Sequence, residues 1–415
     1  MEIRGVNVPP VTAPASAPQG SAAAEAAAPE VVIQSDSYLG GSVQWIPPME
    51  MSRGGYKKHV PDGTKRIDVL KDVLHLDQVH DQMGITGKGV TVAVIDTGIY
   101  PHPDYADRIV GWKDMVNDRA TPYDDNGHGT HCAGLVLGNG YMAGGKFKGS
   151  APEASLVGVK VLSGEGGGAM SDVVRGIEWA IENKEKYNIR VLSMSLGAPS
   201  FQKEKYDLVA KAVEKAWDAG IVPVIAAGNS GPFLETIGSP GMSSKSVTIG
   251  AYDDKNTADL NDDTMAFFSS RGPTTRDRTI KPDLASPGVQ LVSTLSKGST
   301  IDHENIPRYG DDYILLSGTS MATPVAAGVV ACVLQADPNL TPGQVVDLLR
   351  STTHPLADTS PLVQGAGLID PVAAVGRALE MKKADDAREA APAGEQPAVA
   401  AAPAPSQGAA ETVAR

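Results

Sequence analysis

The chain has 415 residues, of which 41% are hydrophobic and 20% charged, with a formal net charge of −13 at pH 7. This much apolar sequence can form one large core, and the acidic balance argues against a nucleic-acid partner. The two cysteines indicate buried, reduced thiols and argue against a disulfide framework.

The first sixty residues differ in composition from the central part of the chain. Residues 11–30 are dominated by Ala, Pro, Glu and Gln, with too few large apolar groups to offset the entropy of ordering. We therefore expect an N-terminal extension over residues 1–60 that is partly disordered. The start of the chain lacks a charged segment followed by an apolar one, and we expect a soluble, cytoplasmic protein with no membrane partner.

A strand buried on both faces is predicted at residues 90–96, where the run Val-Thr-Val-Ala-Val-Ile-Asp is β-branched and apolar up to its last residue. That last residue is Asp96. Open α/β sheets build their sites at the carboxyl ends of strands, so Asp96 is a candidate site residue.

Small residues surround a histidine in the run Asn-Gly-His-Gly-Thr-His-Cys-Ala-Gly at residues 126–134. Such residues let the start of a helix pack closely against its neighbours, so we expect His128 to be held at a helix start. The second histidine, His131, is expected to pack in the interior without a catalytic role. The preceding Asp124 and Asp125 fit two interpretations equally well, because they could line a cleft or cap a turn.

Apolar strands alternate with helical stretches from residue 84 to residue 374 without an internal repeat. This alternation predicts one α/β domain with a mostly parallel sheet covered on both faces. Within it, five aspartates gather in one short segment, for which a solvated surface loop is favoured over a metal site. They are Asp253, Asp254, Asp259, Asp262 and Asp263.

The run Ser-Gly-Thr-Ser-Met-Ala-Thr-Pro at residues 317–324 places Ser320 directly before a helix, residues 321–336, that is apolar almost all round and so is expected to be buried. A serine hydroxyl is a weak nucleophile unless a base takes its proton, and that base needs an orienting carboxylate. We assign Ser320 as the nucleophile, His128 as the general base and then acid, and Asp96 as the orienting group.

The three motifs, in the chain order Asp, His, Ser, resemble those of the subtilisin-like serine proteases, or subtilases. Residues 94–98 are similar to the family's Asp motif, residues 126–134 to its His motif and residues 318–324 to its Ser motif. The resemblance is closest to bacterial subtilases made without a secretion signal. It implies a three-layer α/β fold in a catalytic domain at residues 61–380, and residues 381–415 are expected to form a disordered, Ala/Pro-rich tail.

The same resemblance assigns Asn229 to the oxyanion site, together with the backbone N–H of Ser320. It implies that substrate binds as an extended strand between residues 166–168 on one side and residues 195–197 on the other. It also implies a preference for large apolar residues before the scissile bond. The implied substrate-binding residues are Gly166, Gly168, Met170, Ser195, Leu196, Gly197, Ala227 and Gly228.

Calcium is the one cofactor that the resemblance implies, since subtilases commonly bind it for stability. Asp104 matches the family's usual carboxylate ligand. The loop at residues 137–148 is longer than the family's calcium loop and has no carboxylate, so the site is not located beyond Asp104.

The segment Val43 to Pro48 resembles the short apolar, proline-containing segment by which intracellular subtilisins block their own cleft. A linker with one buried tryptophan explains it equally well. The sequence thus predicts a serine endopeptidase that acts on proteins and peptides, and it leaves the oligomeric state open. Two alternatives are a processing protease with one target and a peptide-binding protein that does not cleave.

Overall fold

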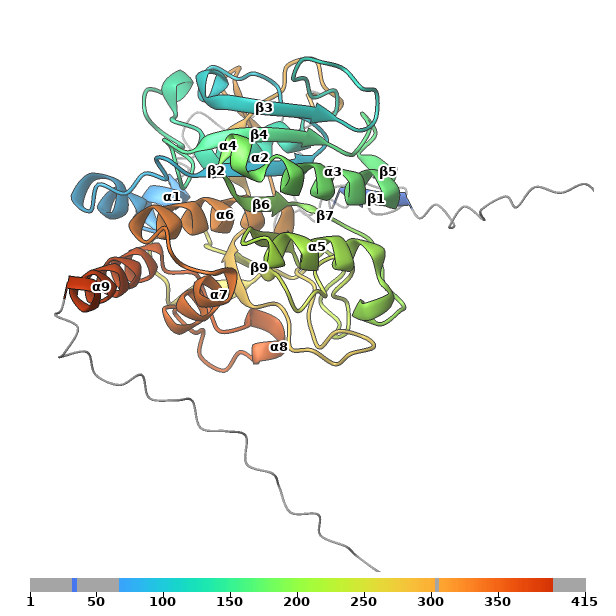
Figure 1. The fold of residues 1–415 in the computed structure, drawn as a ribbon. Coiled ribbons are helices and arrows are strands. Elements are labelled where there is room, and N and C mark those ends of the chain that lie inside the picture. Colours follow the sequence, from blue (N-terminus) through green and yellow to red (C-terminus); the bar gives the residue numbers. More distant parts are fainter. Residues whose placement is uncertain (1–31, 36–66, 303–305, 391–415) are drawn as a thin grey trace, which may run out of the picture. The chain divides into compact units, whose positions relative to one another are not determined.

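A mostly parallel sheet runs through the part of the chain that the computed structural model describes, namely residues 32–35, 67–302 and 306–390. The strand order is β10-β9-β8-β6-β2-β4-β3, with β11 beside β9. Figure 1 labels β3, β4, β2, β6 and β9 of this sheet. Neighbours run parallel except β10, which is antiparallel to β9. The strands are β2 (Thr91–Asp96), β3 (Ile109–Asp114), β4 (Ser155–Lys160), β6 (Ile189–Met194), β8 (Val222–Ala226), β9 (Val247–Asp253), β10 (Thr264–Met265) and β11 (Leu284–Pro287).

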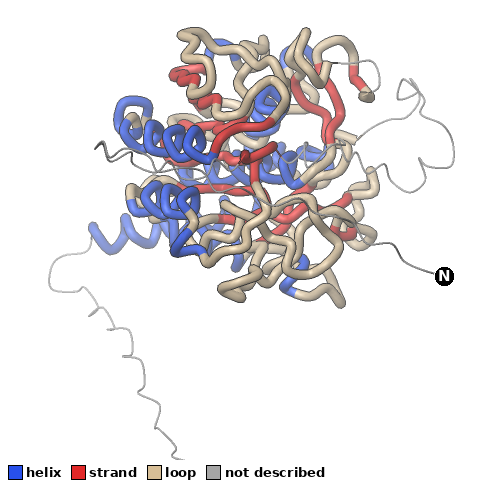
Figure 2. The backbone as a smooth tube through the Cα atoms, turned by 90° about the vertical axis from the view of Figure 1, so that its right-hand side faces the viewer, coloured by secondary structure: helices blue, strands red, loops and turns tan. Residues whose placement is uncertain are grey.

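The central strands are buried on both faces because their apolar side chains alternate between two cores. In β2, Val92 and Val94 belong to one hydrophobic cluster, whereas Ala93 and Ile95 belong to the other. The first cluster also holds apolar residues of helices α2 (His128–Leu137) and α6 (Thr319–Ala336), and the second holds those of α3 (Met170–Glu182) and α5 (Leu208–Asp218). Figure 2 shows the strands in red among the blue helices that cover them. The predicted three-layer α/β architecture is confirmed.

Helix α6 passes through the larger core. Among the described helices, it is the one with the length and apolar composition of a membrane span, but 94% of that stretch is buried inside the protein. Gly328 allows its close approach to α2, because a Cβ there would lie 2.9 Å from the carbonyl oxygen of Val136. The expectation of a buried helix after Ser320 is confirmed.

Two small sheets lie outside the central one. One has the order β5-β1-β7 and the other β12-β14-β13. Their strands are β1 (Val32–Ser35), β5 (Gly167–Ala169), β7 (Leu196–Gly197), β12 (Leu291–Thr294), β13 (Arg308–Tyr309) and β14 (Tyr313–Leu316). The short helices are α1 (Val69–Asp72), η2 (Gln78–Gln82), η3 (Ala106–Arg108), η4 (Tyr141–Ala143), α4 (Lys184–Tyr187), η5 (Glu204–Tyr206), α7 (Pro342–Ser351) and α8 (Pro361–Gln364).

The last helix is longer than the sequence predicted. Helix α9 (Pro371–Ala390) continues ten residues past residue 380, so the prediction of a disordered tail beginning at 381 was wrong. Its final turns are exposed, but they are rich in strong helix formers and carry an ion pair between Lys382 and Asp386 at helical spacing. Composition favours a tail there, whereas helix propensity decides the structure. Residues 391–415 lie outside the described residues, as do residues 1–31 and Val43 to Pro48.

Candidate active site

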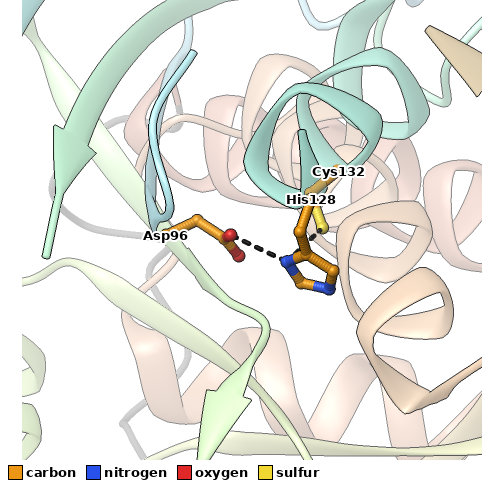
Figure 3. Close-up of side chains that lie close together, drawn as sticks. All are labelled: Asp96, His128 and Cys132. Carbon is orange, nitrogen blue, oxygen red and sulfur yellow. Dashed lines mark hydrogen bonds and ion pairs between the residues drawn. The ribbon is translucent and has the colours of Figure 1, made fainter. Parts of the chain in front are cut away.

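The carboxylate at the end of β2 meets the imidazole at the start of α2. Nδ1 of His128 lies 2.7 Å from Oδ1 of Asp96, and both side chains are fully buried (Figure 3). The same oxygen accepts a hydrogen bond from the backbone N–H of Thr97. Burial disfavours the charged imidazole, but Asp96 outweighs it and raises the pKa of His128 well above its ordinary value. The pair can therefore stabilise an imidazolium that forms during a reaction.

Close packing brings the helix start onto the strand end. A Cβ at position 129 would lie 2.2 Å from the carbonyl oxygen of Gly98, so only glycine fits between α2 and the chain after β2. Asp124 holds the same turn, since its Oδ1 accepts from the N–H of Gly127 and its Oδ2 from the N–H and hydroxyl of Thr130. Of the two interpretations left open for Asp124, the structure supports the turn cap.

Asp125 faces a residue that the sequence analysis missed. Its Oδ1 lies 2.7 Å from Nζ of Lys160, a fully buried lysine at the end of β4 that also donates to the carbonyl oxygen of Leu162. Lys160 stands opposite Asp96 in the sheet register. The signal was a charged residue ending an apolar strand, the same pattern that identified Asp96.

The second histidine of the motif has a structural role, as expected. His131 is fully buried, and its Nε2 lies 3.2 Å and 3.1 Å from the carbonyl oxygens of Leu291 and Ile314. Burial, followed by the charge of His128, lowers the pKa of His131 to about 3. The side chain therefore stays neutral and joins α2 to the β12-β14 sheet.

Ser320 is the second residue of α6, and Cys132 contacts both this serine and His128. Cys132 links the two, because its Sγ is 3.9 Å from Nδ1 of His128 and 3.4 Å from the carbonyl oxygen of Ser320. The serine hydroxyl donates to the carbonyl oxygen of Ser195 at 3.3 Å, and Nε2 of His128 has no hydrogen-bond partner among the described residues. Nucleophilic attack requires the serine side chain to turn toward that nitrogen. Hydrogen bonds between a nucleophile and its base often tighten only when substrate is present.

Asn229 is oriented by the residue before the serine. Its Oδ1 accepts hydrogen bonds from the backbone N–H and the hydroxyl of Thr319, at 2.9 Å and 3.0 Å. The amide nitrogen then lies on the side of Gly318, where an added Cβ would be 3.2 Å away. The backbone N–H of Ser320, in the first turn of α6, has no acceptor within the helix. The side-chain amide of Asn229 and the backbone N–H of Ser320 are the two groups that the sequence assigned to the oxyanion site, and that assignment stays a prediction.

The two predicted substrate-binding segments form the outer strands of one small sheet. Gly168 lies in β5, Leu196 and Gly197 form β7, and Met170 begins α3 directly after β5. Between them runs β1, antiparallel to both, with Ile33 opposite Gly168 and Gln34 opposite Gly197. A segment of the chain's own N-terminal extension therefore lies where an extended substrate was expected.

A pocket of about 200 Å³ opens beside β7. Gly197, Ala227 and Gly228, three of the predicted substrate-binding residues, line it together with the segment from Thr236 to Ser239. The pocket lining also includes Glu235, a carboxylate beside a site for which an apolar preference was predicted. That carboxylate is paired with the guanidinium of Arg278.

Two groups of potential metal ligands can be compared with the calcium prediction. Both oxygens of the buried Asp104 accept hydrogen bonds, Oδ1 from the N–H of Met142 and Oδ2 from the hydroxyl of Tyr313. Calcium at Asp104 stays a prediction. A second group has its ligand atoms within 4.8 Å of one another and consists of Asp96, His128 and Cys132 (Figure 3). This set of donors suits a soft metal ion, which would bind the histidine that is needed as the general base.

Comparisons with known proteins agree with this geometry. The model of the subtilase family matches residues 87–376. Serine protease AprX of Bacillus subtilis (strain 168) is 49% identical over 311 residues, covering 73% of this chain and 70% of that protein. Subtilisin E of the same strain is 37% identical over 323 residues, covering 77% and 72%.

Two solved structures are similar to the described fold. Sphericase superposes with a TM-score of 0.57 at 29% identity, covering 69% of this chain and 92% of that chain. A cold-adapted subtilisin-like serine proteinase superposes with a TM-score of 0.52 at 33% identity, covering 69% and 88%.

Proposed function

The chain belongs to the subtilase family and is a serine endopeptidase, and from that premise we propose a broadly specific enzyme whose cleft is occupied by its own N-terminal segment until that segment leaves. The observation that carries the proposal is β1, which pairs with both walls of the cleft. Cys132 and Cys332 are buried thiols that form no disulfide, which supports a cytoplasmic location. Asp104 remains the proposed ligand of a stabilising calcium ion.

The chemistry follows from the assembled groups. Oγ of Ser320 attacks the carbonyl carbon of the scissile peptide bond while Nε2 of His128 takes the hydroxyl proton. Asp96 holds the ring through Nδ1 and stabilises the imidazolium. The amide of Asn229 and the N–H of Ser320 donate to the oxyanion. The imidazolium then protonates the leaving amine, and water, deprotonated by the same histidine, hydrolyses the acyl-enzyme.

The pocket beside β7 supports a preference for a large apolar residue before the scissile bond. Nine of its fifteen lining residues are Gly, Ala or Ser, which leaves room for a bulky side chain. The charge of Glu235 is offset by Arg278, with both side chains about half exposed to solvent. Burying an aromatic side chain there contributes about 1.5–3 kcal/mol of binding free energy.

We expect a peptide with Phe before the scissile bond to be cleaved about 10–100-fold more efficiently, as kcat/KM, than the same peptide with Ala. A peptide with Arg should be the poorer substrate in the wild type and should improve in Arg278→Ala, because the partner of Glu235 is then removed. The matched control is Arg276→Ala, two residues away and outside the pocket lining. A strict preference for Arg or Glu in the wild-type enzyme would contradict the proposal.

The proposed latency assigns the inhibitory role to a different segment from the one that the sequence suggested. The sequence pointed to Val43 to Pro48, which lies outside the described residues, whereas Val32 to Ser35 forms the cleft strand. An extended backbone between β5 and β7 uses the same edge hydrogen bonds that a substrate strand needs. Because the strand is tethered, its effective concentration is on the order of millimolar, so even weak pairing competes with substrate.

We expect a chain lacking residues 1–36 to hydrolyse a short chromogenic peptide about tenfold faster than the freshly purified, unprocessed full chain, whose intact mass is checked first. The matched control lacks residues 1–30 and so keeps β1. A second pair is Ile33→Pro, which removes one backbone donor from the strand, against Val31→Pro just outside it. Equal rates of hydrolysis for the full chain, the chain lacking residues 1–36 and Ile33→Pro would refute the proposal. Activation only on deletion of residues 43–48 would also refute it.

A further inference from the structure

The hairpin of β9 and β10 brings two buried carboxylates face to face. The strands pair with Thr264 opposite Asp253 and Met265 opposite Tyr252. Asp254 and Asp263 are the next residues beyond Asp253 and Thr264, toward the loop, and the charge of Asp254 acts on Asp263. The pair lies on the inward face, because Asp254 is fully buried and only 6% of Asp263 is exposed. Like charges directly opposite each other destabilise a hairpin, so this arrangement needs a compensating group.

The described part of the chain supplies no such group to Asp263. Neither of its carboxylate oxygens accepts a hydrogen bond there, and the buried hydroxyl of Tyr252 on β9 has no partner either. Lys255, the one lysine between the two aspartates, pairs instead with Asp253 on the outward face. A buried carboxylate without donors is strongly unfavourable unless it is protonated or binds a cation.

Two other aspartates of the hairpin, unlike Asp263, do accept hydrogen bonds. Asp254 accepts from the N–H of Asn256 at 2.7 Å, and Asp262 accepts from the hydroxyl of Thr257 through both oxygens. Burial, and then the charges of Asp254, Asp262, Asp253 and Asp259, raise the pKa of Asp263 to about 7. The solvated surface loop predicted for these aspartates was therefore wrong for Asp254 and Asp263, whose side chains face the interior.

We propose that the loop at residues 254–263 binds a hard divalent cation, Ca²⁺, through the carboxylates of Asp263 and Asp254. Calcium takes six to eight oxygen ligands in flexible geometry, and the two buried carboxylates would supply the charged part of that set. This site shares no residue with Asp104 and does not depend on the proposed latency.

The cation would stabilise a part of the fold on which the substrate pocket depends. The hydroxyl of Ser269, shortly after β10, accepts a hydrogen bond from the N–H of Ala251 in β9. The N–H of Ser270 donates to the carbonyl oxygen of Gly228 in the pocket wall. The loop also holds the start of the described catalytic region, since Oδ1 of Asn256 accepts from the N–H of Ile67. Calcium removal should therefore lower thermal stability.

The test uses the full chain carrying Ser320→Ala, so that self-digestion does not obscure unfolding. We expect 1 mM CaCl₂ to raise Tm by about 5 °C relative to EGTA, and Asp263→Asn to remove most of that rise. Equilibrium dialysis with calcium should show one bound ion fewer in Asp263→Asn. The matched control is Asp259→Asn at an exposed position, which should keep both the calcium-dependent rise in Tm and the number of bound ions. Asp104→Asn shows whether one of the bound ions is held by Asp104 instead.

Asp254→Asn is the second variant, in case Asp263→Asn does not fold, and the same loss of one ion is expected. Unchanged calcium stoichiometry and an unchanged calcium-dependent Tm in either folded variant would overturn the proposal. A variant that is stabilised equally with calcium and with EGTA would also overturn it, because the two carboxyls would then share a proton rather than an ion.

Discussion

Ser320→Ala is expected to lower kcat by about a million-fold, the size of the loss that follows removal of the triad serine in subtilisin. The structure gives the reason, because the position next to His128 then holds no group that can form the acyl-enzyme. The fold should be unaffected, since Oγ makes one long hydrogen bond, to the carbonyl oxygen of Ser195. The measurement is hydrolysis of a chromogenic peptide with an apolar residue before the scissile bond, with thermal unfolding recorded alongside.

The matched control is Ser317→Ala, the same change three residues earlier, where the exposed hydroxyl accepts from the N–H of Gln290. Ser317→Ala should keep wild-type turnover and should react with a serine-directed phosphonate, with the label found on Ser320. Covalent labelling of Ser320→Ala, or turnover within tenfold of wild type, would remove Ser320 from the nucleophile position. A processed wild type that binds peptides but cleaves none would favour the peptide-binding alternative.

The sequence predicts the position of a site residue where a short local pattern sets the end of the strand or helix that carries it. Asp96 ends an apolar strand, His128 begins a glycine-flanked helix and Ser320 precedes a buried helix, and each of these local patterns fixes where its own backbone element starts or stops. The parallel sheet then brings strand ends to one edge. Family resemblance added the role of Asn229, which no local pattern specifies.

What the sequence did not predict depends on contacts between distant residues. Strand β1 pairs with segments more than 130 residues away, and its own composition gives no sign of that partner. Glu235 reaches the pocket only because the loop that carries it folds beside β7. Asp263 is acidic and lies in a polar stretch, so composition indicates exposure, whereas the hairpin register turns it inward.

Asn229→Ala is expected to lower kcat by about 10²–10³, the range found when the equivalent amide is removed from subtilisin, with KM nearly unchanged. The oxyanion exists only after Ser320 attacks, so a donor aimed at it lowers the free energy of the transition state and not that of the bound substrate. The backbone N–H of Ser320 remains as the second donor, which is why this loss is far smaller than that of Ser320→Ala. Steady-state kinetics on one peptide measures both constants.

A purely structural role for Asn229 gives a different result. Its Oδ1 accepts from Thr319, so truncation could also loosen the turn that carries Ser320. Asn229→Asp keeps that acceptor but replaces the amide donor with a carboxylate oxygen, and it should therefore lose at least as much kcat as Asn229→Ala while Ser320 still reacts with a phosphonate. If Asn229→Asp instead restored wild-type turnover, the acceptor would be what matters and the oxyanion assignment would be wrong.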